Sequence, residues 1–231
     1  LKKNYLLGLS LIANSLILIF FVIFALQYLP GNENMDYLKH YNPIALNLLN
    51  GMSYSNLSVA CEGCNFDTIS AYRPPMFPLF IALTYLISDL INLNQLDVLI
   101  YSQYLMHLVS STFIFLIYRR WFKSNLIPFL ASLIYSSYPL GLYLLKQPNS
   151  EILFNFLLVS FILVFTLIIK DKRYLYGYYL LFSGLLLGLL VLTRYISIAL
   201  PIFICIYLLI FFRENIFINI SKVLLGFLLV F

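Results

Sequence analysis

The sequence predicts an all-α protein: a polytopic bundle of transmembrane helices with a long first extracytoplasmic loop that carries juxtamembrane helices. Of its 231 residues, 62% are hydrophobic and only 10% are charged, and the mean hydropathy is +0.94. This composition lies outside the range of soluble globular domains. Several apolar runs approach or exceed the roughly 20 residues that a helix needs to cross a bilayer.

The first span is predicted over residues 5–29, which carry no charge. A cleavable signal peptide would be shorter and would end in small residues, so this span is expected to be retained. Further spans are predicted over residues 98–118, 126–143, 152–169, 174–192 and 197–212, and another begins at residue 223. The chain is therefore expected to be one membrane-embedded module over residues 1–231, with about six full spans and a truncated seventh. It would then be the N-terminal part of a longer protein.

The apolar run 76–90 is predicted to lie along the outer membrane surface instead of crossing the bilayer. It is short, it carries Asp89, and Pro74 and Pro75 suit a first helical turn. With this topology most basic residues share the cytoplasmic side, as the positive-inside rule requires. The first extracytoplasmic loop then covers residues 30–95. The basic residues on the cytoplasmic side are Lys2, Lys3, Arg119, Arg120, Lys123, Lys170, Lys172, Arg173, Arg213 and Lys222.

A short helix is predicted within this outer loop. Asn42 suits its N-cap, Pro43 its first turn and Gly51 its C-terminal stop. An apolar stripe would let it lie flat on the membrane or on the bundle. The stripe consists of Ile44, Ala45, Leu48 and Leu49.

Glu33 and Asp36 lie just ahead of this helix, at the water interface. A carboxylate there could take the proton of an acceptor hydroxyl as a general base, and the alternative is a solvated loop acid. Arg73 precedes a double proline, where its planar guanidinium could pair with a lipid phosphate or simply reach up to the headgroups. Arg73, its neighbour Tyr72 and Glu33 are the candidates for substrate binding in this loop.

Two further charges stand at the ends of predicted spans. Arg194 lies among apolar residues, where an unpaired charge is costly. It is expected to face a wet cavity or an anion, and the alternative is an ordinary interfacial loop. Glu151 begins a span on the same side as Asp36, so it could orient a substrate or help to hold a cation. The alternative is that Ser150 and Glu151 only cap the helix and complement its dipole.

Metal and redox chemistry have weak support in the sequence. Cys61 and Cys64 lie in the predicted outer loop, where an oxidising compartment favours a local disulfide. A zinc site would need more ligands, and no second CxxC pair occurs. His40 could exchange a proton with Asp36, whereas His107 is expected to be structural. No glycine-rich phosphate-binding loop for a nucleotide occurs. The sequence thus predicts no metal site and no certain cofactor, although a divalent cation stays an option.

Several separated stretches, in this order, resemble a known family: an acid after the first span, then ALNLLNGMSYS, YRPPMFPLFIAL, NSEILF and GLLLGLLVLTRYISIALP. Together they resemble the GT-C type glycosyltransferases that use polyprenyl-phosphate sugars, and within them the protein O-mannosyltransferases and aminoarabinose transferases. The resemblance implies that Asp36 and Glu151 are active-site carboxylates and that Arg73 and Arg194 lie near the donor phosphate. The family spacing points one residue past Asp36, so Glu33 stays a competing candidate for the first acid.

The resemblance further implies an integral membrane enzyme that moves a hexosyl or pentosyl unit to an acceptor hydroxyl on a lipid, glycan or protein. Its active site would face the extracytoplasmic side of the cell membrane, among membrane lipids, with no nucleic acid as partner. The alternative is a transporter or flippase for a lipid-linked or small polar substrate. That alternative requires buried polar groups at the midplane and pseudo-symmetric halves, and the sequence reveals neither. A third reading is an inactive membrane scaffold, which this stretch alone could be.

Overall fold

The computed structural model describes residues 2–25, 34–55, 73–171, 177–211 and 216–230. Every regular element within these ranges is a helix, which confirms the predicted all-α class. Three described segments are long and apolar enough to cross a membrane, and shorter apolar helices accompany them. The three segments are Tyr5–Phe24, Gln95–Trp121 and Ser150–Lys170.

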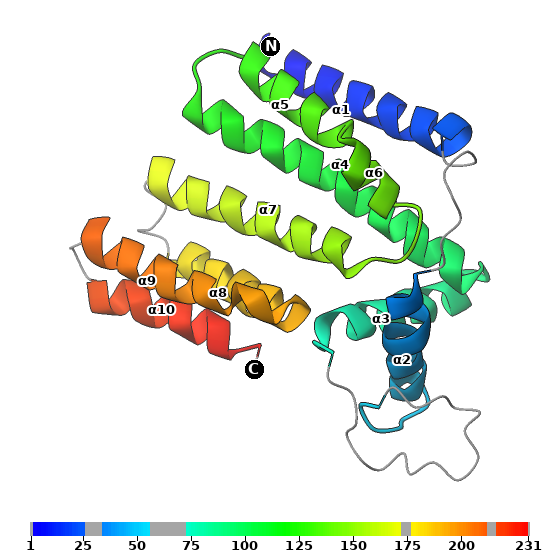
Figure 1. Ribbon diagram of the computed structural model, residues 1–231. Coiled ribbons are helices and arrows are strands. Elements are labelled where there is room, and N and C mark those ends of the chain that lie inside the picture. Colours follow the sequence, from blue (N-terminus) through cyan, green and yellow to red (C-terminus); the bar gives the residue numbers. More distant parts are fainter. Residues whose placement is uncertain (1, 26–33, 56–72, 172–176, 212–215, 231) are drawn as a thin grey trace.

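Most of the helices run side by side in a bundle, while α2 (Asn42–Leu49) and α3 (Met76–Ile91) lie at the bundle end where α4 and α7 begin (Figure 1). This end assembles the candidate site described below. The helices of the bundle are α1 (Lys2–Phe20), α4 (Gln95–Trp121), α5 (Leu126–Ser136), α7 (Ser150–Lys170), α8 (Gly177–Thr193), α9 (Ala199–Phe211) and α10 (Ile216–Leu228).

The first helix is fastened to the bundle by polar side chains. α1 ends in a π-helical turn, η1 (Phe21–Ala25), and its buried face carries Ser10 and Asn14. The Asn14 amide donates to Ser111 Oγ of α4 at 3.1 Å and accepts from Ser136 Oγ of α5 at 2.8 Å. Such hydrogen bonds join helices in apolar surroundings. The bundle therefore does contain buried polar groups, and the ones in this cluster are uncharged.

The span predicted over residues 126–143 is interrupted. α5 ends at Ser136, and a separate short helix, α6 (Pro139–Leu144), follows it. Pro139 has no backbone N–H and disfavours a helical conformation at the residue before it. That residue, Tyr138, is extended, with ψ of 117°. The prediction of one continuous helix was wrong here, because apolar side chains continue across the proline and the helical hydrogen bonds do not.

The helix of the outer loop begins earlier than predicted. A π-helical segment, η3 (Tyr37–Tyr41), runs directly into α2, so Asn42 is itself helical and is the C-cap of η3 instead of the N-cap of α2. The Asn42 side chain instead accepts a hydrogen bond from the Tyr85 hydroxyl of α3 at 2.7 Å. The predicted end is confirmed, since Gly51 stops the helix with φ of +71°, a conformation that glycine adopts readily.

α2 and α3 pack on each other and close the end of the bundle. Ile44 and Ala45, from the predicted apolar stripe, are fully buried, as are Phe77 and Ile81 of α3. At the end of α3, Asn92 takes a left-handed conformation with φ of 54°, which turns the chain sharply into α4. α3 lies across the bundle end (Figure 1). Its place along the outer membrane surface stays a prediction.

α8 and α10 approach each other through glycines. A Cβ at Gly184 would lie 2.8 Å from the carbonyl carbon of Val223, and one at Gly226 would lie 2.9 Å from that of Leu181. Both distances are shorter than van der Waals contact, so the absence of side chains permits this close packing. α10 also begins before residue 223, the predicted start, and therefore contains Lys222.

α4 and α7 end at the opposite end of the bundle (Figure 1), and their last turns carry the basic residues Arg119, Arg120 and Lys170. Arg120 forms an ion pair with Asp171 at 2.5 Å. Lys170 Nζ lies 3.7 Å from the centroid of the Trp121 ring, a cation–π contact. The charged ends of α4 and α7 are thus joined to each other, far from α2 and α3.

Candidate functional site

A polar cavity of about 770 Å³ lies where α3 and α7 begin and α8 ends. It contains two of the three candidate carboxylates, Asp36 and Glu151, and both candidate arginines, brought together from four separate parts of the chain. The residues that line it are Asn34, Met35, Asp36, Tyr41, Arg73, Pro74, Asn149, Ser150, Glu151, Thr193, Arg194, Tyr195 and Ile196.

Asp36 and Arg73 form one ion pair in this cavity. Arg73 Nη2 lies 2.5 Å from Asp36 Oδ1, and the side chains are 28% and 53% exposed, respectively. The guanidinium carbon lies 5.7 Å from the centroid of the Tyr41 ring, within cation–π range. The Tyr54 hydroxyl donates to the Arg73 carbonyl oxygen at 2.7 Å, and burial raises the pKa of Tyr54, so this donor keeps its proton. Two tyrosines therefore hold Arg73 while its charged end faces the cavity.

Glu151 and Arg194 form the second ion pair, in which Arg194 Nη2 donates to Glu151 Oε1. Arg194 stands between α8 and a short 3₁₀-helix, η5 (Tyr195–Ile198), in an extended conformation. Glu151 lies in the first turn of α7, where the positive end of the helix dipole favours an acid. The N-cap position of this helix belongs to Asn149, without a capping hydrogen bond from its side chain. Pairing with Arg194 is thus the main contact of the Glu151 carboxylate.

A chain of hydroxyl groups aligns the segments that carry Asp36 and Arg73. The Tyr37 and Tyr85 hydroxyl oxygens lie 2.6 Å apart, and both rings are buried. This contact fixes η3 against α3. Because Asp36 directly precedes η3 and Arg73 stands just ahead of α3, the first ion pair is set by the packing of these two elements.

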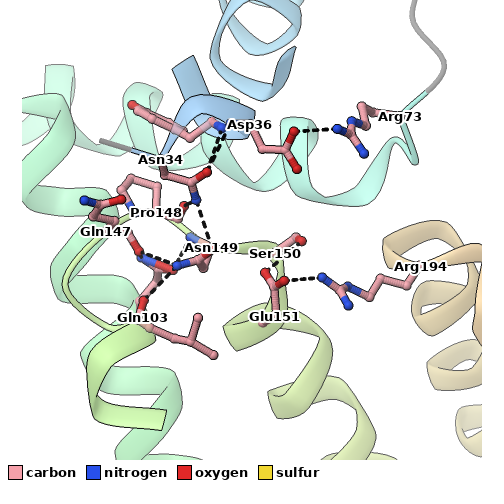
Figure 2. A network of polar contacts seen from close by, with 12 residues as sticks. Asn34, Asp36, Arg73, Gln103, Gln147, Pro148, Asn149, Ser150, Glu151 and Arg194 are labelled. Carbon is pink, nitrogen blue, oxygen red and sulfur yellow. Dashed lines mark hydrogen bonds and ion pairs between the residues drawn. The ribbon is translucent and has the colours of Figure 1, made fainter. Parts of the chain in front are cut away.

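An amide network, missed by sequence reasoning, connects the two acidic segments (Figure 2). Asn34 Nδ2 donates to Pro148 O at 2.6 Å and to Asn149 Oδ1 at 2.9 Å. The Asn149 backbone N–H in turn donates to Gln103 Oε1 of α4 at 2.8 Å. In the sequence, the two asparagines could have been singled out only by their position, since Asn34 and Asn149 each stand two residues ahead of a candidate acid.

Several other predicted features do not enter the cavity as the structure describes it. His107 is buried in α4, where its ring stacks on Tyr135 with centroids 5.0 Å apart, so it has a packing role. Within the described ranges, no group of three or more His, Cys, Asp or Glu side chains is arranged to hold a metal ion. Four predicted residues lie outside the described ones: Glu33, Tyr72, Cys61 and Cys64.

Two further cavities continue from the polar one along the bundle. A cavity of about 190 Å³ shares Glu151 with it and reaches Tyr135 and Tyr138. Both tyrosines also line an apolar groove of about 550 Å³ between α4 and α5, together with aliphatic side chains such as Leu130 and Ile134. Because neighbouring cavities share lining residues, the small cavity lies between the charged site and the apolar groove.

The family model of the dolichyl-phosphate-mannose-protein mannosyltransferases matches residues 72–231, more than half of the chain. The matched part includes Arg73, Glu151 and Arg194. Asp36 lies ahead of it, so its place beside these residues rests on its ion pair with Arg73. Comparisons with curated proteins and with solved structures gave no match.

Proposed function

The chain belongs to the dolichyl-phosphate-mannose-protein mannosyltransferase family, and from this premise we propose that it moves a sugar from a polyprenyl-phosphate donor to an acceptor hydroxyl on the extracytoplasmic side. Family and apolar helices together make it a multi-pass membrane glycosyltransferase. The proposal rests on one observation, the meeting of Asp36, Arg73, Glu151 and Arg194 in a single cavity. Its volume falls within the range of roughly 300–1,000 Å³ of small-molecule sites. Family membership also favours a transferase over a transporter.

In the proposed reaction, the acceptor oxygen forms a bond to the anomeric carbon while the bond from that carbon to the phosphate oxygen breaks. Asp36 takes the proton of the acceptor hydroxyl. The bonding electron pair leaves on the phosphate oxygen, where Arg73 and Arg194 stabilise the growing negative charge. Attack from the side opposite the phosphate inverts the configuration of this carbon. Glu151 holds Arg194 and orients the substrate.

The ion pairs in the cavity are weak enough to be exchanged for a substrate. All four charged side chains are between 28% and 53% exposed, and ion pairs in contact with water contribute only about 0–1 kcal/mol. A hydrogen bond to a charged group contributes roughly 1.5–3 kcal/mol when the surroundings are drier. A guanidinium also matches a phosphate with two parallel N–H donors. The donor phosphate can therefore replace a carboxylate on either arginine without unfolding the site.

The apolar groove between α4 and α5 offers a path for the prenyl chain of the donor. It shares Tyr135 and Tyr138 with the small cavity, which in turn shares Glu151 with the charged cavity. A prenyl chain is purely apolar, and removing it from water is favourable by about 25 cal/mol per Å². With the phosphate at the arginines, the chain would follow these cavities toward Ile134.

The distribution of charge supports the extracytoplasmic placement. Arg120 and Lys170 lie at the end of the bundle opposite the cavity, and basic residues prefer the cytoplasmic side. Single cysteines at positions 89 and 120, in a protein without other cysteines, test this orientation. A membrane-impermeant maleimide should label the Asp89→Cys protein in intact cells and the Arg120→Cys protein only after lysis. The reverse pattern would exclude an extracytoplasmic cavity.

The reaction itself is tested by two substitutions. Asp36→Asn removes the proton acceptor without changing its size, and Arg73→Ala removes a phosphate partner. Each should lower transfer from a labelled polyprenyl-phosphate sugar in membranes by about 100-fold or more. Asp97→Asn and Lys123→Ala are matched controls, because both residues are exposed and lie outside the cavity, and they should leave transfer unchanged. Undiminished transfer by both cavity variants would remove the mechanism.

A further inference from the structure

We infer that Asn34 is a positioning residue, whose side chain fixes the spacing between the segment that carries Asp36 and the segment that carries Glu151. This inference rests on the proposed function, because it assigns these two acids to one site. It concerns a residue outside the part matched by the family model. Figure 2 shows the Asn34 amide between the two acidic segments.

One half of the amide group serves the Asp36 segment. Asn34 Oδ1 accepts hydrogen bonds from the backbone N–H groups of Asp36 at 3.1 Å and Tyr37 at 3.3 Å. This is the local turn that an asparagine side chain makes with residues two and three positions ahead. It sets the direction in which the chain leaves Asn34, and therefore the direction of the Asp36 side chain.

The other half of the amide group serves the Glu151 segment. Asn34 Nδ2 donates to Pro148 O at 2.6 Å and to Asn149 Oδ1 at 2.9 Å. These acceptors are 114 and 115 residues away in sequence, and they immediately precede α7, which carries Glu151 in its first turn. A single side chain thus contacts the backbone on both sides of the cavity.

The acceptor segment is itself anchored to the bundle. Gln103 of α4 is fully buried, and its Oε1 accepts from the Asn149 N–H at 2.8 Å while its Nε2 donates to Gln147 O at 3.3 Å. Asn149 Nδ2 also donates to Leu144 O at 3.1 Å. The chain ahead of α7 is therefore held in place, and Asn34 transmits that position to Asp36.

Only an amide of this length fits both tasks. It offers an acceptor and two donors on one group, whereas an aspartate lacks the donors and a serine is too short to span both segments. Groups in an active site need placement to within a fraction of an ångström, and a shift of about 1 Å can cost about 100-fold in rate. Loss of the donor half should therefore lower turnover and leave the phosphate contacts of the arginines intact.

The first test compares Asn34→Ser with Asn50→Ser in the full chain. Serine can keep the local turn and loses the bridge. Asn50, the C-cap of α2, is exposed, and among the described residues its side-chain amide donates to Leu46 O of that helix. We expect kcat for sugar transfer to fall about 10- to 100-fold in Asn34→Ser, with KM for the lipid donor unchanged within about twofold. Asn50→Ser should behave as the unaltered protein. A rise in KM of about 10- to 100-fold with unchanged kcat would overturn the inference, because it would make Asn34 a residue that binds the donor.

The second test replaces the hydrogen bond by a covalent one. Asn34→Cys and Asn149→Cys are combined in a chain whose Cys61, Cys64 and Cys205 are serine. We expect a disulfide, seen on a non-reducing gel, and a higher kcat in the oxidised than in the reduced protein. Failure of the disulfide to form would refute the juxtaposition. An oxidised protein no faster than the reduced one would show that the amide does more than set a distance.

The two proposals fail in different ways. If the unaltered protein transfers no sugar from the lipid donor, the proposed function fails, whereas disulfide formation between positions 34 and 149 still tests the bridge. If transfer occurs and Asn34→Ser retains full kcat, the proposed function stands and the positioning role of Asn34 is refuted.

Discussion

Exchanging the partners of the second ion pair separates folding from catalysis. The double variant Glu151→Arg with Arg194→Glu keeps an ion pair between the same two backbones. The native side chains are 39% and 40% exposed, and pairs in contact with water are worth about 0–1 kcal/mol. An arginine in the first turn of α7 also meets the positive end of the helix dipole, a term of about 0.3–1 kcal/mol. We therefore expect the free energy of unfolding to fall by no more than about 2 kcal/mol. The single variant Arg194→Glu places two acids together and should be less stable than the double variant.

Catalysis should respond much more strongly than stability. The exchange moves the guanidinium from the end of α8 to the start of α7, away from the position proposed for the departing phosphate. Removing one preoriented partner of a developing charge typically costs about 100- to 1,000-fold in kcat. Transfer of labelled sugar in membranes measures this loss, and thermal unfolding in detergent measures stability. Transfer above a tenth of the native rate would show that the pair does not serve the reaction. A stability loss of several kcal/mol would show that the pair maintains the fold.

Three further substitutions test the fold around the site. Gly184→Ala should lower the unfolding temperature, because its Cβ would overlap the backbone carbonyl group of Val223, and backbone atoms cannot rotate away as a flexible side chain would. Gly8→Ala, with open space around its Cβ, is the matched control and should be neutral or stabilising. Asn14→Ala should destabilise the detergent-solubilised protein by about 1–2 kcal/mol, through loss of its hydrogen bonds to α4 and α5. It should leave kcat per folded molecule unchanged. Ile134→Trp should raise KM about tenfold for a long-chain donor and not for a short-chain one; an equal effect on both would argue against the groove.

Much of the site was accessible from sequence because charges are rare in an apolar chain. Arg73, Glu151 and Arg194 stand out against their surroundings, and each lies at the end of an apolar run, where a charge is least costly. Hydropathy also located most helices to within a few residues. Such patterns report which residues meet lipid or water along one helix.

What hydropathy cannot report is which helices touch and how closely. The bridge from Asn34 to Asn149 spans 115 residues and involves uncharged side chains that are common in loops. The contact of Gly184 with α10 depends on a backbone approach that no apolar count reveals. Pro139 was visible in the sequence as a possible helix break, but the apolar residues on both sides of it led to the prediction of one continuous span.

Among the described residues that line the polar cavity the charges cancel, two acids against two arginines. A cavity without net charge attracts anions only weakly over long distances, so recognition of the donor phosphate depends on direct contact with the arginines. Under the proposed reaction, a lipid phosphate that takes over Arg73 would release Asp36 just when an acceptor is due to arrive. Binding of the lipid donor would then activate Asp36 as a base. An acceptor that bound before the donor would find Asp36 still paired with Arg73.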